Sequence, residues 1–301
     1  MNLKSRKWLD FVLNLRTSVI PRIWWAVAVS MIFAFLITIL YKNGVNWLHQ
    51  PTLASLIPAI VLGLLLVFRT NTSYDRFWEG RKIIGSLIND ARSLGILLWV
   101  NIYEKNREDT EAKMAAVRLI AVFFIALKLH LRKENADEKI KSLITEKQYL
   151  ELTNVDHMPL RAMKWMGEYV KQMHDRHYID SIQLTAYNQL IEKLVGYVGA
   201  CERILNTPIP PAYSIHLKHL LFIYCTALPF YLSADLGWFT IPAAGIITFA
   251  LLGIEAIGIE IENPFGYDPN DLPLDRLNDV LLSNLEELMM SDSPKEYLVE
   301  K

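Results

Sequence analysis

The sequence predicts an all-α membrane protein with four transmembrane helices per subunit and a helical cytoplasmic domain. The chain of 301 residues is 52% hydrophobic, and yet 21% of its residues are charged. Four long runs carry almost no charge, and the remaining sequence repeats its apolar residues at spacings of three and four. We therefore expect the apolar residues to be concentrated in membrane spans and the charged residues in parts that contact water.

These four runs, uncharged except for Lys218 at the beginning of the third, are long enough, or nearly so, to cross a bilayer as helices. A hydrocarbon core of about 30 Å needs about 20 mostly apolar residues at about 1.5 Å per residue. The first two runs cover residues 23–41 and 53–68, and the last two cover residues 217–232 and 236–254. These runs are the four predicted spans.

A fifth run, residues 115–131, is also apolar enough to be considered as a transmembrane helix. Arg118 and Lys128 lie within it. Each of these charges would cost about 2.5–3.5 kcal/mol at the centre of a membrane helix. We therefore predict that this run forms a buried core helix of the cytoplasmic part.

The basic residues predict the orientation in the membrane. Several lysines and arginines precede the first span, and Arg69, Arg76, Arg81 and Lys82 follow the second. The two short connections on the other side carry one basic residue between them. Because cytoplasmic loops are rich in lysine and arginine, we expect both termini to be cytoplasmic and the protein to lie in the cell (inner) membrane.

The spans divide the chain into four parts. Residues 1–68 hold the N-terminal segment and the first two spans, and residues 69–210 form the helical cytoplasmic domain. Residues 211–258 hold the last two spans, and residues 259–301 hold an acidic turn and a C-terminal cytoplasmic helix.

The sequence carries no common catalytic motif, so we do not expect an enzyme. Nucleotide-binding glycine patterns, the nucleophile elbow and the zinc-protease motif are all absent. His174 with His177, and His216 with His219, are spaced so that each pair could share a metal ion, but no carboxylate or cysteine evidently completes either site. The net charge of −1 gives no indication of a nucleic-acid partner.

The second span carries a possible pore lining. Ile60, Leu64 and Phe68 are spaced by four residues and share one face of a helix. Such a stripe is also typical of a surface that packs or faces lipid. Because the uncharged spans offer no polar interior, a conducting protein would need an oligomer axis and a narrow apolar constriction that gates by dewetting.

The segment after the fourth span could bind a hard cation. Asp268 and Asp271 lie in an irregular turn, with Asn263 nearby, and carboxylates with free backbone carbonyls are the ligands that Ca²⁺ prefers. The alternative is a turn in which Asp and Asn bond to the local backbone.

Three stretches together resemble the bestrophin family. FRTNTSYDRFWEGRKIIGSLINDARSL at 68–94 resembles the family signature after the pore-lining helix, and NTPIPPAY at 206–213 resembles its return to the membrane. NPFG at 263–266, followed by two aspartates, resembles its post-membrane turn. The resemblance covers nearly the whole chain and is greatest to the bacterial members and to the thylakoid voltage-dependent chloride channels.

The resemblance implies a homopentamer with one central pore in the lipid bilayer. It assigns the apolar neck to Ile60, Leu64 and Phe68, and a second, cytoplasmic constriction to Ile179. In animal members the turn after NPFG forms a calcium clasp. The matching residues here are two side-chain ligands and two backbone carbonyl donors, namely Asp268, Asp271, Glu260 and Asn263.

The calcium expectation is weakened by residues that depart from the animal pattern. Tyr267, Pro269 and Asn270 stand where the animal members are almost continuously acidic. We therefore expect no required cofactor, with Ca²⁺ as the ion to test.

The favoured function is a passive pentameric channel for chloride and other small anions. An apolar neck has no fixed charge, so a monovalent cation channel of the same architecture is the alternative. A non-conducting membrane scaffold is the third possibility. A secondary transporter is disfavoured because the spans lack ionisable residues away from their ends and no repeat is visible.

Overall fold

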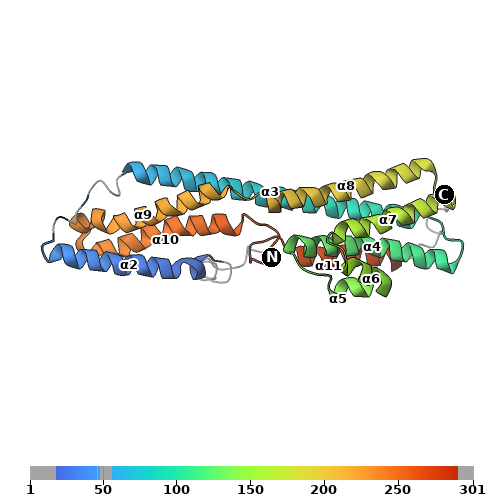
Figure 1. Ribbon diagram of the computed structural model, residues 1–301, viewed down its shortest axis with the longest axis horizontal. Coiled ribbons are helices and arrows are strands. Elements are labelled where there is room, and N and C mark those ends of the chain that lie inside the picture. Colours follow the sequence, from blue (N-terminus) through green and yellow to red (C-terminus); the bar gives the residue numbers. More distant parts are fainter. Residues whose placement is uncertain (1–17, 46, 48–49, 51–55, 291–301) are drawn as a thin grey trace, which may run out of the picture. The chain divides into compact units, whose positions relative to one another are not determined.

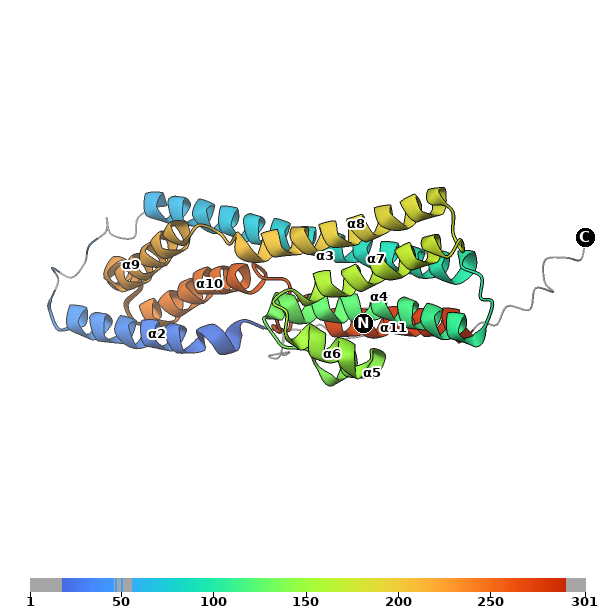
Figure 2. The same cartoon turned by 45° about the vertical axis from the view of Figure 1, so that its right-hand side comes forward.

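The structure, a computed structural model, describes residues 18–45, 47, 50 and 56–290, and all regular elements among them are helices (Figures 1 and 2). The elements are α2 (Ile20–Lys42), α3 (Leu56–Asn101), α4 (Arg107–Arg132), α5 (Glu138–Leu143), α6 (Glu146–Thr153), α7 (Met158–Asp175), α8 (Ser181–Asn206), α9 (Pro211–Leu236), the short 3₁₀ helix η4 (Gly237–Phe239), α10 (Thr240–Glu260) and α11 (Leu274–Met290). The predicted all-α class is confirmed in this part of the chain.

The chain folds into two compact units. The first contains the described residues up to Trp78 together with Pro208–Asp271, and the second contains Glu79–Thr207 together with the described residues from Leu272 onward. Helix α3 contributes residues to both units. The C-terminal helix α11 belongs to the second unit.

In the first unit, α2, α9 and α10 pack against one another, and they lie side by side in both views (Figures 1 and 2). Large apolar side chains such as Trp24, Phe222 and Ile246 remain exposed on these helices. Their exposure is expected of helices that lipid surrounds, because hydrocarbon removes such surface from water.

Four stretches of the described chain are long and apolar enough to cross a membrane. They are α2, α3, α4 and the stretch from Ser181 to Glu260, which contains the separate helices α8, α9 and α10. The chain is therefore an all-α membrane protein, and burial separates α4 from the other three.

Helix α4 is the core of the second unit. Its residues from Ala116 to Leu131 are almost all buried, against α7 and α11 among others, whereas Arg118 points outward and is exposed. The buried Lys128 donates to Asp275 Oδ1 at 2.9 Å. The prediction of a buried core helix for this run is thus confirmed, because its two charges are either solvated or paired.

The ion pair of Lys128 with Asp275 ties α4 to α11. Arg132 also donates to Asp275, at 2.8 Å to Oδ2. Burial alone would raise the pKa of Asp275, but the hydrogen bonds from Arg132 and Lys128 outweigh it and lower that pKa to about 2. The carboxylate therefore stabilises the unit above about pH 4, and this contribution is lost as the pH falls through about 2.

Local sequence explains how α8 and α9 begin. Asp180 caps α8 by accepting from the backbone N–H of Gln183, whose side chain bonds back to the N–H of Asp180. The proline-rich stretch that follows ends α8 at Asn206, and Pro211 occupies the first turn of α9, where its missing N–H costs nothing.

Candidate functional site

Helix α3 has two different faces in the first unit. Leu62 and Leu66 are each 2% exposed and pack with Leu217 and Leu221 of α9. Side chains on the other face point away from the unit. This division fixes the rotation of α3 about its own axis. Turning the helix would expose Leu62 and Leu66 and would bury side chains that now point outward.

The residues predicted as the neck all lie on the outward face. Ile60, Leu64 and Phe68 are 52%, 54% and 63% exposed, and Ile57 and Val67 extend the same apolar surface. An apolar stripe of this length must be covered by lipid or by other protein chains, since water would leave it unfavourably solvated.

The outward face becomes polar directly after Phe68. Asn71 and Asp75 continue the stripe at helical spacing, and both are exposed. The apolar band is therefore bounded at this end by an amide and a carboxylate. The sequence motif contains both residues, but only the helix register shows that they share a face with the neck.

Arg69 follows the apolar band and points to the opposite, buried side. Its side chain is 3% exposed, and Nη2 donates to Glu262 Oε2 at 3.2 Å. Nη1 donates to Ser214 Oγ at 2.7 Å. The guanidinium thus joins α3 to the first turn of α9 and to the turn after α10.

Three further hydrogen bonds support this junction. Glu262 Oε1 accepts from the backbone N–H of Ile209 at 3.0 Å, and Tyr213 donates its hydroxyl proton to the carbonyl of Leu65 at 2.6 Å. Arg76 Nε donates to the backbone carbonyl of Glu262 at 3.1 Å. We define the Arg69 junction as Arg69, Ser214 and Glu262 with these supporting bonds.

The turn after α10 is closed by its own aspartate. Asp271 Oδ2 accepts from the N–H of Asp268 at 2.8 Å, and the N–H of Asp271 donates to the carbonyl of Asp268 at 2.9 Å. A Cβ on Gly266 would lie 2.8 Å from Asp271 Oδ2, so a larger residue would displace that carboxylate.

The other two residues of the expected calcium site also bond locally. Asn263 Oδ1 accepts from the N–H of Phe265 at 3.3 Å, and Glu260 Oε1 accepts from Asn270 Nδ2 at 2.7 Å. In the described part of the chain, no three acidic side chains converge at this turn. The turn therefore has the form of local backbone closure, and calcium binding here stays a prediction.

Ile179, the expected second constriction, lies between α7 and α8 and is 4% exposed. The preceding residues are fixed by Asp109, which accepts from Tyr178 Oη at 2.8 Å and from Arg176 Nη2 at 2.8 Å. The hydrogen bond from Tyr178 holds the pKa of Asp109 below its usual value. Ile182, in the first turn of α8, is 82% exposed and is the larger apolar surface at this end.

Neither of the two histidine pairs at helical spacing belongs to a group of three or more potential metal ligands among the described residues. Among the described residues, the histidine and carboxylate atoms that do gather belong to His130, His157 and Glu202 instead. These three residues are far apart in the sequence, so no spacing rule could find them.

Comparisons with known proteins agree on one family. The family model for bacterial and fungal bestrophin proteins matches residues 1–287. The "Voltage-dependent anion channel-forming protein alr2987" of Nostoc sp. is 46% identical over 96% of this chain and 94% of its own length. The protein sll1024 of Synechocystis sp., which has the same descriptive name, is 44% identical over 94% of this chain and 92% of its own length.

Solved structures give the same result. The crystal structure of a variant of a bacterial bestrophin homologue from Klebsiella pneumoniae superimposes with a TM-score of 0.82 at 25% identity. It covers 89% of this chain and 99% of its own.

The Arg69 junction predicts a large loss of stability when its cation is removed. Arg69→Met keeps most of the side-chain volume but leaves the Glu262 carboxylate without its cation, so we expect the free energy of unfolding to fall by about 3 kcal/mol. Thermal unfolding in detergent measures the loss, and Arg69→Met/Glu262→Gln should recover part of it.

The matched control is Arg107→Met. Arg107 pairs with Glu111, but both side chains are largely exposed, so the loss should stay below about 0.5 kcal/mol. An Arg69→Met protein no less stable than this control would contradict the structural role of the junction.

The calcium prediction is tested by the melting temperature of the wild type with and without Ca²⁺. If the turn binds the ion, Ca²⁺ raises the midpoint, and Asp268→Asn/Asp271→Asn removes the rise. A wild type whose midpoint does not respond to Ca²⁺ would end the assignment.

Proposed function

The chain belongs to the family of bacterial and fungal bestrophin proteins, and we propose that it forms a passive anion channel of the bestrophin type. The main support for this function is the chain's similarity, over nearly its full length, to relatives named as voltage-dependent anion channel-forming proteins. The outward apolar stripe of α3 supports the same function, because it supplies a surface that a single chain leaves uncovered.

Five copies of the chain would surround one pore, with Ile60, Leu64 and Phe68 contributing apolar rings. Each ring would narrow the pore and exclude water when the constriction closes. Asn71 and Asp75 would follow the neck at its cytoplasmic mouth. The pentamer, the bilayer and small inorganic ions are then the partners of this chain.

The second, cytoplasmic constriction would lie at the start of α8. The family resemblance indicates Ile179, but its side chain is 4% exposed and has little surface to offer to a pore. Ile182 is 82% exposed and would present the apolar surface, while Ile179 would support it from within the unit.

The membrane would be the cell (inner) membrane, with both termini in the cytoplasm. The basic residues before the first span and after the second support this orientation. The apolar exposure of α2, α9 and α10 supports their place in the bilayer.

Cation selectivity is the alternative, and one observation favours it. Asp75 shares the outward face of α3 with the neck and is exposed. Five such carboxylates at one mouth would attract cations and repel anions, because rings of acidic side chains select for positive ions. The relatives' names favour anions, so the anion channel remains the proposal.

The neck proposal predicts that a wider apolar constriction passes more current. Replacing Ile60, Leu64 and Phe68 together by alanine removes the bulk of each ring without adding charge. We expect a larger single-channel current in planar bilayers than the wild type gives.

A control triple variant carries alanine at Phe222, Ile223 and Ile246. These residues are also apolar and exposed, but they lie on α9 and α10. Its current should equal that of the wild type. If the α3 variant and the control both conduct like the wild type, the neck does not lie on this stripe. Separately, a monomeric mass of the purified protein in detergent would favour the non-conducting scaffold.

A further inference from the structure

We propose that His130, His157 and Glu202 form a binding site for a transition-metal ion of the Zn²⁺ class. The three residues come from different elements of the second unit: His130 from the last turn of α4, His157 from the N-cap of α7, and Glu202 from α8. The site is separate from the proposed pore lining and from the turn after α10.

The three ligand atoms already converge. Glu202 Oε1 lies 2.7 Å from His130 Nε2 and 3.0 Å from His157 Nε2. The donor atoms of all three side chains lie within 4.8 Å of one another. Ligand atoms around a tetrahedral ion at about 2.0–2.2 Å are somewhat more than 3 Å apart, so only a small outward movement is needed to admit one.

The rings and the carboxylate are held in place by their surroundings. The imidazoles of His130 and His157 stack with centroids 4.4 Å apart and ring planes 26° apart. All three side chains are 23–32% exposed, so they are neither freely mobile on the surface nor sealed from solvent.

The ligand set decides the class of ion. Two imidazoles and one carboxylate suit Zn²⁺ and its neighbours, whereas Ca²⁺ and Mg²⁺ prefer oxygen ligands alone. Among the described residues, Glu202 makes ion pairs to the two imidazoles alone, which are cations only when protonated. A divalent ion bound between the three side chains would place a positive charge against this half-buried carboxylate.

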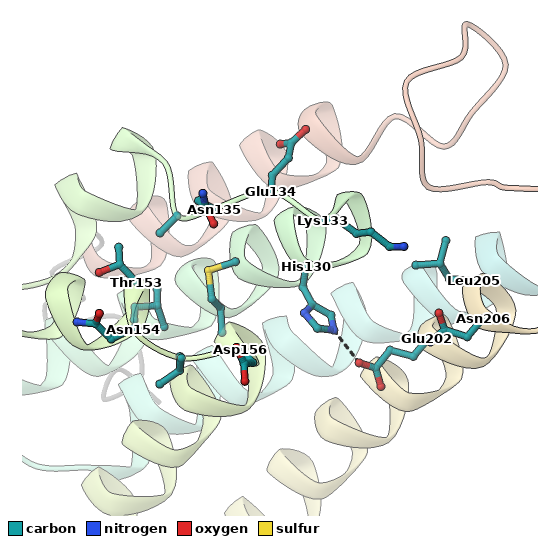
Figure 3. A pocket seen from close by; sticks show the side chains of 14 residues that line it. His130, Lys133, Glu134, Asn135, Thr153, Asn154, Asp156, Glu202, Leu205 and Asn206 are labelled. Carbon is teal, nitrogen blue, oxygen red and sulfur yellow. Dashed lines mark hydrogen bonds and ion pairs between the residues drawn. The ribbon is translucent and has the colours of Figure 1, made fainter.

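A cavity beside the cluster leaves room for a further ligand. Its volume is about 630 Å³, and His130 and Glu202 lie in its wall, joined by a dashed line in Figure 3. Asp156, Asn135 and Asn206 also line it. Water in this cavity would fill the fourth coordination position, and these polar side chains could bond to that water.

Metal binding and helix capping compete at His157. Its Nδ1 accepts from the backbone N–H of Leu160 at 3.4 Å, so the proton of a neutral ring is on Nε2 in the metal-free protein. When Nε2 binds an ion, that proton leaves Nε2, and a neutral ring then carries its proton on Nδ1. The N–H of Leu160 consequently loses its acceptor.

This competition gives the site a specific signature. A saturating metal ion should stabilise the second unit as a whole, because it joins three helices. It should at the same time increase hydrogen exchange at the Leu160 amide. A cluster held by hydrogen bonds alone would show neither response.

The test uses the full-length protein in detergent with any affinity tag removed. Co²⁺ titration followed by visible absorption reports coordination by nitrogen and oxygen ligands, and competition by Zn²⁺ gives the zinc affinity. Wild type should show d–d bands of low coordination number that Zn²⁺ abolishes. His157→Asn keeps an N-cap acceptor, and Glu202→Gln keeps the side-chain shape; each should weaken zinc binding at least about tenfold.

His174→Asn/His177→Asn is the matched control, because it removes two histidines from outside the cluster. It should bind zinc like the wild type. Equal zinc affinity in wild type, His157→Asn and Glu202→Gln would overturn the proposal, as would the absence of Co²⁺ bands in the wild type.

X-ray absorption of the zinc-loaded wild type gives an answer even if a variant fails to fold. Scattering from two imidazole rings is the expected result. Scattering from fewer than two rings would overturn the assignment.

Discussion

The buried guanidinium of Arg69 fixes which face of α3 points away from the first unit. It lies directly after the apolar stripe of α3, and its bonds to Ser214 and Glu262 hold it on the inner side of the helix. Because neighbouring residues on a helix point about 100° apart, fixing Arg69 inward turns Phe68 outward. The outward position of the proposed neck residues thus depends on a buried polar junction on the opposite side of α3.

The same constraint explains the sequence around the junction. Glu262 accepts a hydrogen bond from Arg69 with one carboxylate oxygen and from the N–H of Ile209 with the other. The turn after α10 and the segment before α9 are therefore joined by one carboxylate. A buried charge of this kind is tolerated only when its partners satisfy it. The three stretches that carry the family resemblance accordingly meet at one place in the first unit.

Much of the fold could be predicted from the sequence, because spans and core helices follow from hydropathy and from the cost of charge. Arg118 and Lys128 predict that α4 is a buried core helix, and its burial confirms this. The shared outward face of Ile60, Leu64 and Phe68 follows from their spacing. The Arg69 junction could not be predicted, since Arg69 and Glu262 are 193 residues apart. The cluster of His130, His157 and Glu202 could not be predicted for the same reason. Its side chains come from different helices, and their convergence leaves no local sequence pattern.

Ion conduction and the sign of the conducted ion test the proposed anion channel most directly. The most direct measurement is the reversal potential of the purified protein in a planar bilayer under a KCl gradient. An anion channel with an apolar neck predicts a reversal near the equilibrium potential of chloride. A reversal near the equilibrium potential of potassium would contradict anion selectivity and favour cation selection by Asp75. The absence of any current from an intact oligomer would contradict the channel itself.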